Sequence, residues 1–166
     1  RGRALVRSGD LAGAESSLLR ALKQASGRSD LWNDLGAVRA RLGRTNEAED
    51  AFRKAVDLKP GRPEGSYNLG RLLADQDRLE EALEAYRRAL RAAPSFEPAW
   101  TNLAAAHIRL GDPTAAVSAL QEALDVSPDA PELMIGLADA HLAGRALGEA
   151  GQAYEAALAL DSESYR

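Results

Sequence analysis

Apolar residues recur along the chain with the period of an α-helix. The segments that begin at Ala48, Ala82, Ala116 and Ala150 carry apolar residues at offsets 0, 3, 4, 7 and 8, and a weaker copy begins at Ala14. In a helix of 3.6 residues per turn, these offsets form one stripe. The pattern therefore predicts helices with one buried face, and the alanines predict close approach of neighbouring backbones.

The four strong segments start 34 residues apart, and a further helical segment precedes each, most clearly over residues 31–42. Pro60, Pro94 and Pro128 recur at the same spacing, where a proline cannot continue the helix. The sequence thus predicts ten helical segments, two in each unit with the first unit incomplete, and no strands. We place a single array over residues 1–166, with units at 1–28 (partial), 29–62, 63–96, 97–130 and 131–164.

One unit carries a set of residues at the spacing of a known repeat signature: Trp32, Leu35, Gly36, Ala48, Phe52, Ala55 and Pro60. This set closely resembles the signature of the tetratricopeptide repeat (TPR) family, and the resemblance extends in one register over nearly the whole chain. It implies an all-α fold, a right-handed superhelical α-solenoid of stacked helix-turn-helix repeats. It also implies binding of other proteins.

Several positions depart from the family pattern. Arg39 occupies an inward position that is often aromatic, and Ser66 and Met134 stand where two other units have tryptophan. Packing at these positions is expected to be looser or rearranged. In the last unit Gly144 is interpreted as shifting the turn. Gly148 and Gly151 lie within or beside the second helix and predict the least stable unit of the array.

Composition excludes several classes of protein. The net charge is −4 and the sequence pI is near 5.3, so we expect no nucleic acid partner, because helical repeats that read RNA are usually basic. No apolar run is long enough to cross a membrane, so no membrane insertion is expected. Cysteine is absent, which excludes disulfides and thiolate metal sites but fits either redox environment. The compartment is therefore unknown, with a soluble cytoplasmic protein favoured over a periplasmic one. The chain opens at Arg1 inside a repeat, which we interpret as a fragment of a longer protein.

Charge is distributed unevenly among the units. The net charges are +4, +1, −1, −4 and −4 in chain order, with the last two residues counted in the final unit. Drift among solvated surface charges explains such a gradient equally well. The sharper hypothesis is self-association, in which the acidic end of one copy meets the basic first unit of another, head to tail.

Residue patterns typical of catalysis are weak. His107 and His141 are the only histidines, and they occupy equivalent positions of consecutive units, which the repeat alone explains. The stretch at 65–70 has two glycines, but Arg71 and Leu72 follow where a phosphate loop needs lysine and a hydroxyl residue. We predict no catalytic residues, no metal site and no cofactor, hence no enzyme activity in this chain.

The family resemblance implies a ligand groove on the concave side, lined by the first helices of the units. The candidate groove residues are Asn33, Arg41, Tyr67, Asn68, Arg71, Thr101, Asn102 and Arg109. In the last unit, the same helix face carries Ile135, Asp139, Leu142 and Ala143.

Within this groove, Asn68 and Asn102 resemble the asparagine ladder of the O-linked N-acetylglucosamine transferase repeats, in which amides hold the backbone of an extended peptide. Arg41 and Arg109 are expected to contact ligand carboxylates. Arg71 could instead pair with Asp75, four residues on. The Lys-x-x-x-Asn pattern of chaperone-binding repeat domains is missing.

Three functions remain open. The favoured one is a scaffold or adaptor that binds an extended or acidic peptide segment of a partner. The second is the recognition region of a larger enzyme, such as a glycosyltransferase or sulfotransferase, with its catalytic domain outside this chain. The third is a self-associating structural module.

Overall fold

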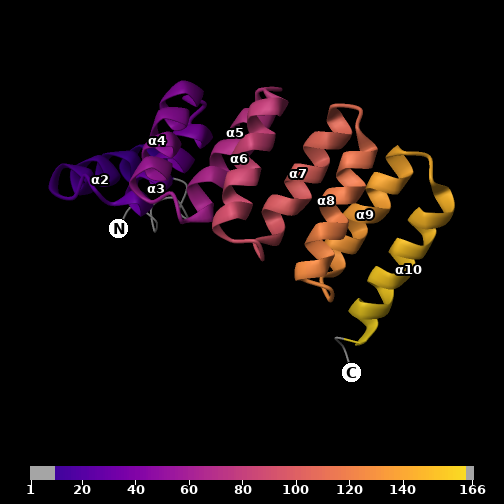
Figure 1. Cartoon of the computed structure of the whole chain (residues 1–166). Coiled ribbons are helices and arrows are strands. Elements are labelled where there is room, and N and C mark those ends of the chain that lie inside the picture. Colours follow the sequence, from indigo (N-terminus) through magenta and orange to yellow (C-terminus); the bar gives the residue numbers. More distant parts are fainter. Residues whose placement is uncertain (1–9, 164–166) are drawn as a thin grey trace.

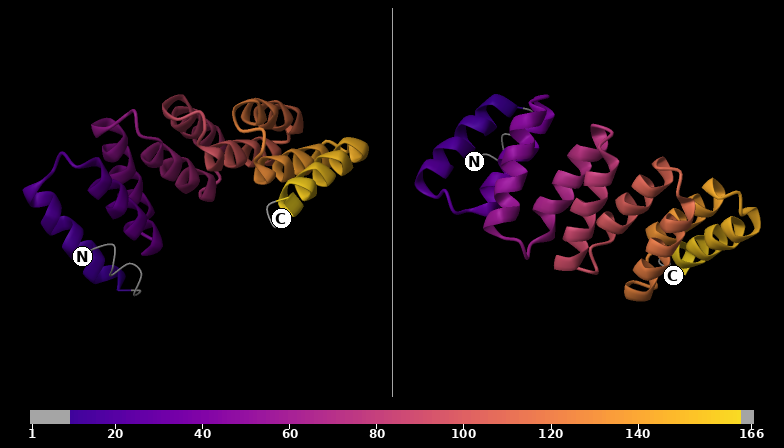
Figure 2. Two further views of the ribbon diagram at one scale, coloured as in Figure 1. Left: turned by 90° about the horizontal axis from the view of Figure 1, so that it is seen from below. Right: turned by 45° about the horizontal axis from the view of Figure 1, so that its top comes forward.

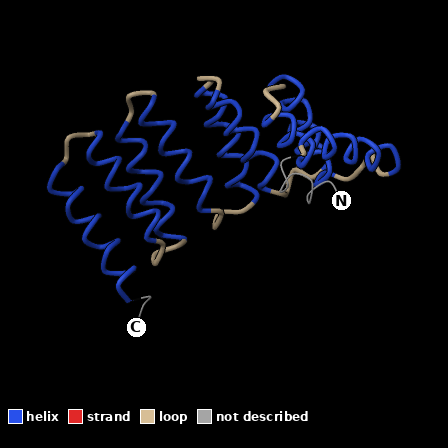
Figure 3. Tube along the Cα trace, turned by 180° about the vertical axis from the view of Figure 1, so that it is seen from behind, coloured by secondary structure: helices blue, strands red, loops and turns tan. Residues whose placement is uncertain are grey.

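The structure, a computed structural model, describes residues 10–163, which form nine helices and no strand (Figure 3). The predicted all-α class is confirmed. The helix expected at the start of unit 1–28 lies outside the described residues. The first helices of the units are α3 (Ser29–Arg41), α5 (Pro63–Asp75), α7 (Glu97–Arg109) and α9 (Pro131–Ala143). The second helices are α2 (Leu11–Gln24), α4 (Thr45–Leu58), α6 (Leu79–Ala92), α8 (Pro113–Val126) and α10 (Leu147–Glu163).

Helix pairs stack side by side along the chain, so that each unit packs only against its sequence neighbours (Figure 1). Seen from below, the stack bends into an arc (Figure 2, left). Successive first helices contact one another, whereas successive second helices do not pack together to a comparable extent. Helices on the inner side of a bend come closer together than those on the outer side. The first helices therefore line the concave side, as the family resemblance implied.

The turns inside the units share one backbone feature. Gly43, Asp77, Gly111 and Arg145 lie 34 residues apart, and all four have positive φ, at 74°, 61°, 79° and 60°. Glycine adopts this conformation without cost, and aspartate tolerates it better than most residues. The interpretation that Gly144 shifts the last turn is wrong: Gly144 has φ −80°, and Arg145 takes the left-handed position in the common register.

A recurring contact joins the two helices of a unit. A methyl group built on Gly36 would lie 2.6 Å from ring carbons of Phe52, and one on Gly70 would lie 2.6 Å from a ring carbon of Tyr86. Glycine is required here because the aromatic ring rests directly on the backbone of the first helix. In the next unit, Leu120 is fully buried in the position that corresponds to Tyr86.

The tryptophan position differs among the units. The indole N–H groups of Trp32 and Trp100 donate to the carbonyl oxygens of Ser26 and Pro94, each at 2.7 Å, and so fix the preceding loop. At the same position Ser66 is only 1% exposed, and its hydroxyl oxygen has no hydrogen-bond partner among the described residues. Ser66 is therefore buried at this position without anchoring the loop.

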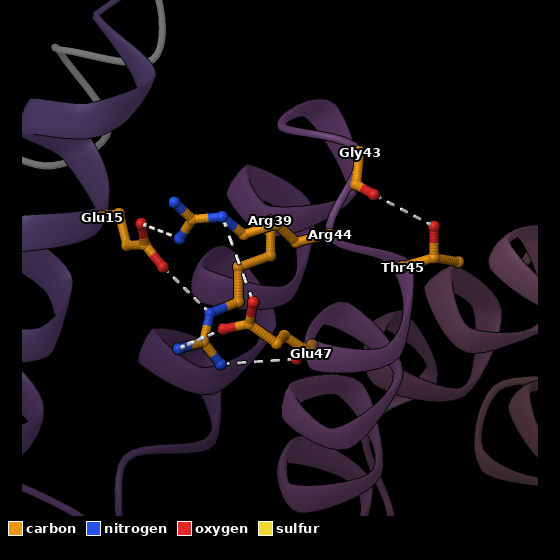
Figure 4. A network of polar contacts seen from close by, with 6 residues as sticks. All are labelled: Glu15, Arg39, Gly43, Arg44, Thr45 and Glu47. Carbon is orange, nitrogen blue, oxygen red and sulfur yellow. Dashed lines mark hydrogen bonds and ion pairs between the residues drawn. The ribbon is translucent and has the colours of Figure 1, made fainter.

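Buried carboxylates link the N-terminal units. Glu15 on α2 accepts hydrogen bonds from Arg39 Nε at 3.1 Å and Arg44 Nη1 at 2.8 Å (Figure 4). Arg39 also lies 3.4 Å from a carboxylate oxygen of Glu47. The inward position of Arg39 is thus filled by an ion pair in place of an aromatic ring, which is how packing is rearranged there.

The link is repeated one unit later. Glu49 on α4 is 5% exposed and pairs with Arg78 Nη1 at 2.8 Å and with Arg53 at 2.5 Å. Arg78 also donates two bonds of 2.6 Å to Glu81. These partners raise the pKa of the Arg78 guanidinium and lower the pKa of the Glu81 carboxyl. Each N-terminal interface therefore contains one buried, doubly paired carboxylate.

Candidate functional site

The two candidate ladder amides are used within the protein. Asn68 Nδ2 donates to Asn33 Oδ1 at 2.9 Å, and Asn102 Nδ2 donates to the Tyr67 hydroxyl at 3.1 Å. Each bond joins a first helix to the one before it. A side-chain amide has two N–H donors and one oxygen acceptor, so each asparagine keeps a donor and its oxygen for a ligand. Both amides therefore brace neighbouring helices on the inner face and still offer hydrogen-bonding groups.

Arg109 caps the preceding first helix. Its Nη1 donates to the carbonyl oxygen of Ala74 and its Nη2 to Asp77, both at 2.9 Å. Ala74 is in the last turn of α5, and its carbonyl oxygen also accepts a hydrogen bond from the Asp77 backbone N–H at 3.1 Å. The sequence pattern does not predict this role, because the bonds cross from one unit to another. Arg109 can meet a ligand carboxylate only with its remaining N–H groups.

Arg71 has a different environment. The expected alternative, an ion pair with Asp75, is not among the ion pairs of residues 10–163. The Arg71 guanidinium carbon lies 5.9 Å from the centroid of the Tyr67 ring, within cation–π range. Tyr67 in turn meets the edge of Phe96, with the ring centroids 5.2 Å apart. Arg71 is thus an exposed cation resting on a packed aromatic group.

The other candidates lie on the same series of helices. Arg41 is exposed at the last position of α3. The Thr101 hydroxyl donates to the carbonyl oxygen of Glu97 at 3.3 Å, inside α7. All eight candidate residues therefore lie on α3, α5 and α7, which are the first helices of three successive units and lie on the concave side.

In α9, the next first helix, Ile135 and Leu142 are 45% and 44% exposed, which is unusual for large apolar side chains. Between them, Asp139 accepts a hydrogen bond from the Tyr154 hydroxyl at 2.5 Å. This bond raises the pKa of Tyr154. The sequence places Ile135, Asp139 and Leu142 on the same free helix face as Tyr67 and Arg71, although they were not among the candidate groove residues.

Two clefts open on the outer side, between second helices. One, of about 620 Å³, lies between α4 and α6 over Leu69 and Leu73. The other, of about 710 Å³, lies between α6 and α8 and is lined by Trp100 and His107. Their lining residues correspond at the 34-residue spacing, so both follow from the bend of the stack, which spreads the second helices.

Within residues 10–163, no group of three or more histidine, cysteine, aspartate or glutamate side chains is placed to hold a metal ion. Burial, assisted by the nearby positive charge of Arg87, lowers the pKa of His107. Among the described helices, none combines the length and apolar character needed to cross a bilayer.

The chain belongs to the tetratricopeptide repeat family. One TPR family model matches residues 1–63 and 101–165, and a second matches residues 39–107. No curated protein sequence matches the chain.

Solved structures with the same fold include MamA, at 21% identity and a TM-score of 0.83, covering 99% of this chain and 96% of that one. YrrB, described as a TPR protein with an unusual peptide-binding site, has 18% identity and a TM-score of 0.72, with 96% and 82% coverage. A TPR protein of Thermus thermophilus has 26% identity, a TM-score of 0.71, and 96% and 87% coverage. The family and its fold support a protein-interaction scaffold.

Proposed function

We propose that the concave face binds an extended, acidic segment of a partner protein, and that the chain acts as a scaffold and carries out no catalysis. The observation that carries this proposal is the environment of Arg71. Its guanidinium is exposed, rests on Tyr67, and forms no ion pair with a described acidic side chain. A cation held in this way is ready to pair with a ligand carboxylate through a forked hydrogen bond.

Neighbouring groups extend the surface in both directions along the array. Asn68 and Asn102 lie beside Arg71 on α5 and α7, and their spare amide groups can bond a peptide backbone without regard to its sequence. Arg41 on α3 adds a second exposed guanidinium. YrrB, which shares the fold, is itself described as binding a peptide. The proposed ligand is therefore a strand-like segment that crosses α3, α5 and α7.

The test uses a partner protein that is captured with this protein. The affinity of that partner is then measured for a set of single variants. A hydrogen bond to a charged group contributes about 1.5–3 kcal/mol, so Arg71→Ala is expected to weaken binding about tenfold to a hundredfold. Arg41→Ala and Asn68→Ala should also weaken it. Arg87→Ala is the matched control, because Arg87 is exposed on the outer side. Loss of affinity in Arg87→Ala alone would move the site to the outer clefts.

A second candidate, self-association, is favoured by the exposed face of α10. Leu147 and Leu158 are 71% and 69% exposed, whereas Leu79 and Leu90, at the same positions of unit 63–96, are only 6% exposed under the next unit. A second copy could cover this face. Light scattering over a range of protein concentrations, at low and high salt, tests this. A monomer at every concentration in low salt would exclude it.

A further inference from the structure

The inner face changes its chemistry from one unit to the next. At the position of Asn33, the following units have Tyr67, Thr101 and Ile135. Seven residues further on, each unit presents a second side chain of the same face, and these are Ala40, Ala74, Ile108 and Leu142. Only in α9 are both positions large and aliphatic, and both of these side chains are nearly half exposed. Such an apolar pair, rimmed by polar residues, is typical of a binding surface.

The rim of this apolar pair is acidic. Glu132 and Asp139 flank Ile135 on the exposed side of α9. Residues 97–163 contain 11 acidic residues and two arginines, Arg109 and Arg145. Arg109 already pairs with Asp77. The potential over this half of the array is therefore negative, and it favours a positively charged ligand segment.

We infer that Ile135 and Leu142 bind a partner segment in which apolar side chains alternate with lysine or arginine. This inference rests on the proposed function, since it concerns the same concave face. We call such a ligand graded, because its charge changes along its length. An acidic part contacts Arg71 on α5, and an apolar, basic part contacts α9. Lysine or arginine side chains of the ligand pair with Glu132 and Asp139, while its apolar side chains cover Ile135 and Leu142.

The geometry also sets the spacing within the ligand. Arg71 and Asp139 occupy the same position two units apart. Neighbouring packed helices lie about 8–10 Å apart, which gives roughly 16–20 Å between the two contact points. An extended chain covers about 3.3–3.6 Å per residue, so about five or six residues separate the acidic part from the apolar, basic part.

The experiment uses synthetic peptides as probes and fluorescence anisotropy as the measurement. The graded peptide carries two glutamates, a spacer of about five Gly and Ser residues, and a segment of alternating Leu and Lys. A second peptide has the same sequence with Glu and Lys exchanged. Two further peptides contain the acidic half or the Leu-Lys half alone. The graded peptide is expected to bind at least tenfold more tightly than the charge-exchanged peptide.

The protein variants separate the two halves of the site. The double variant Ile135→Ser, Leu142→Ser should bind the graded peptide and the Leu-Lys half at least tenfold more weakly, and should leave the acidic half unaffected. Leu19→Ser is the matched control, because Leu19 is 38% exposed on α2, away from this face. Circular dichroism spectra should show that all variants keep their helices.

The outcomes distinguish this inference from the proposed function. Equal binding of the graded and charge-exchanged peptides, or no effect of the double variant, would overturn the inference. If Arg71→Ala still weakens binding of the acidic half in that case, the proposed function remains. If the Leu-Lys half binds through Ile135 and Leu142 while Arg71→Ala has no effect, the inference holds and the acidic part of the proposed function fails.

Discussion

At the interface between α2 and the next unit, the buried carboxylate of Glu15 pairs with Arg44. The same pair recurs one unit later as Glu49 and Arg78. In the C-terminal half, the position of Glu49 is taken by Leu83 and then by Val117. Leu83 is buried, at 6% exposure. The position of Arg78 is taken by Asp112, whose carboxylate instead accepts a hydrogen bond from the Ala115 backbone N–H and caps α8.

The same interface can therefore be formed by an ion pair or by an apolar contact. The residues at the Glu49 position and at the Arg78 position differ together between the two halves. A buried charge needs its partner, because an unpaired one would have to lose its hydration without compensation. The N-terminal interfaces keep the carboxylate and the arginine, and the C-terminal ones have neither. The difference between the two halves is therefore a coupled one, and single substitutions should disturb it.

The largest effect is expected from Gly70→Ala, because the new methyl group would lie 2.6 Å from the buried Tyr86 ring. Overpacking of this kind costs about 1–3 kcal/mol, and we expect the upper part of that range. Urea unfolding followed by circular dichroism measures it. The matched variant is Gly151→Ala inside α10, where a methyl group would meet no atom within 4 Å. It should stabilise the C-terminal unit by about 0.5–1 kcal/mol, and equal effects of the two variants would contradict the aromatic-on-glycine contact.

A smaller loss is expected from Glu49→Gln, which keeps the shape of the side chain and removes the charge that Arg53 and Arg78 share. We expect a loss of about 1–2 kcal/mol in unfolding free energy, since both arginines are partly solvated. Glu84→Gln serves as the control, because Glu84 pairs with Arg91 where both side chains are exposed. That change should stay within about 0.5 kcal/mol. Equal losses of unfolding free energy in the two variants would show that the N-terminal interface does not depend on the buried charge.

The smallest effect, of opposite sign, is expected from Arg145→Gly. Arg145 is the least suited of the four residues that adopt positive φ in the turns, and relief of its backbone strain should raise stability by up to about 1 kcal/mol. The gain should appear in the melting temperature of the C-terminal unit. In the preceding unit, Gly111→Ala adds a side chain at the equivalent positive-φ position. This variant should lower stability by a similar amount. A loss of stability in Arg145→Gly would show that the arginine side chain contributes more than its backbone costs.

The sequence predicted the fold well because the helical period and the 34-residue spacing are properties of the chain itself. The pattern that begins at Ala48 is sufficient to predict α4, and Pro63 and Pro131 open α5 and α9 at the first helical position. Contacts between units were harder to predict. The bond from Asn102 to Tyr67 and the cap that Arg109 places on α5 depend on side-chain geometry across 35 residues of sequence.

The candidate site was predicted only in outline. The offsets along the first helices identified the residues on the free face of α3, α5 and α7, and they also placed Ile135, Asp139 and Leu142 of α9 on that face. The candidate groove residues nevertheless included none from α9. The large exposed area of Ile135 and Leu142 is a property of the folded structure.

The charged interfaces also affect how the arc responds to bending. Glu15 connects α2 to the next unit through Arg39 and Arg44, and Glu49 connects α4 to the next unit through Arg78. A change in the angle between those units must therefore stretch hydrogen bonds of 2.8–3.1 Å. In the C-terminal half, alanine and leucine surfaces can slide by small amounts with little loss of contact. The array is therefore expected to be stiffer at its N-terminal end and more compliant toward α9, where a ligand would find the surface that adapts most easily to its shape.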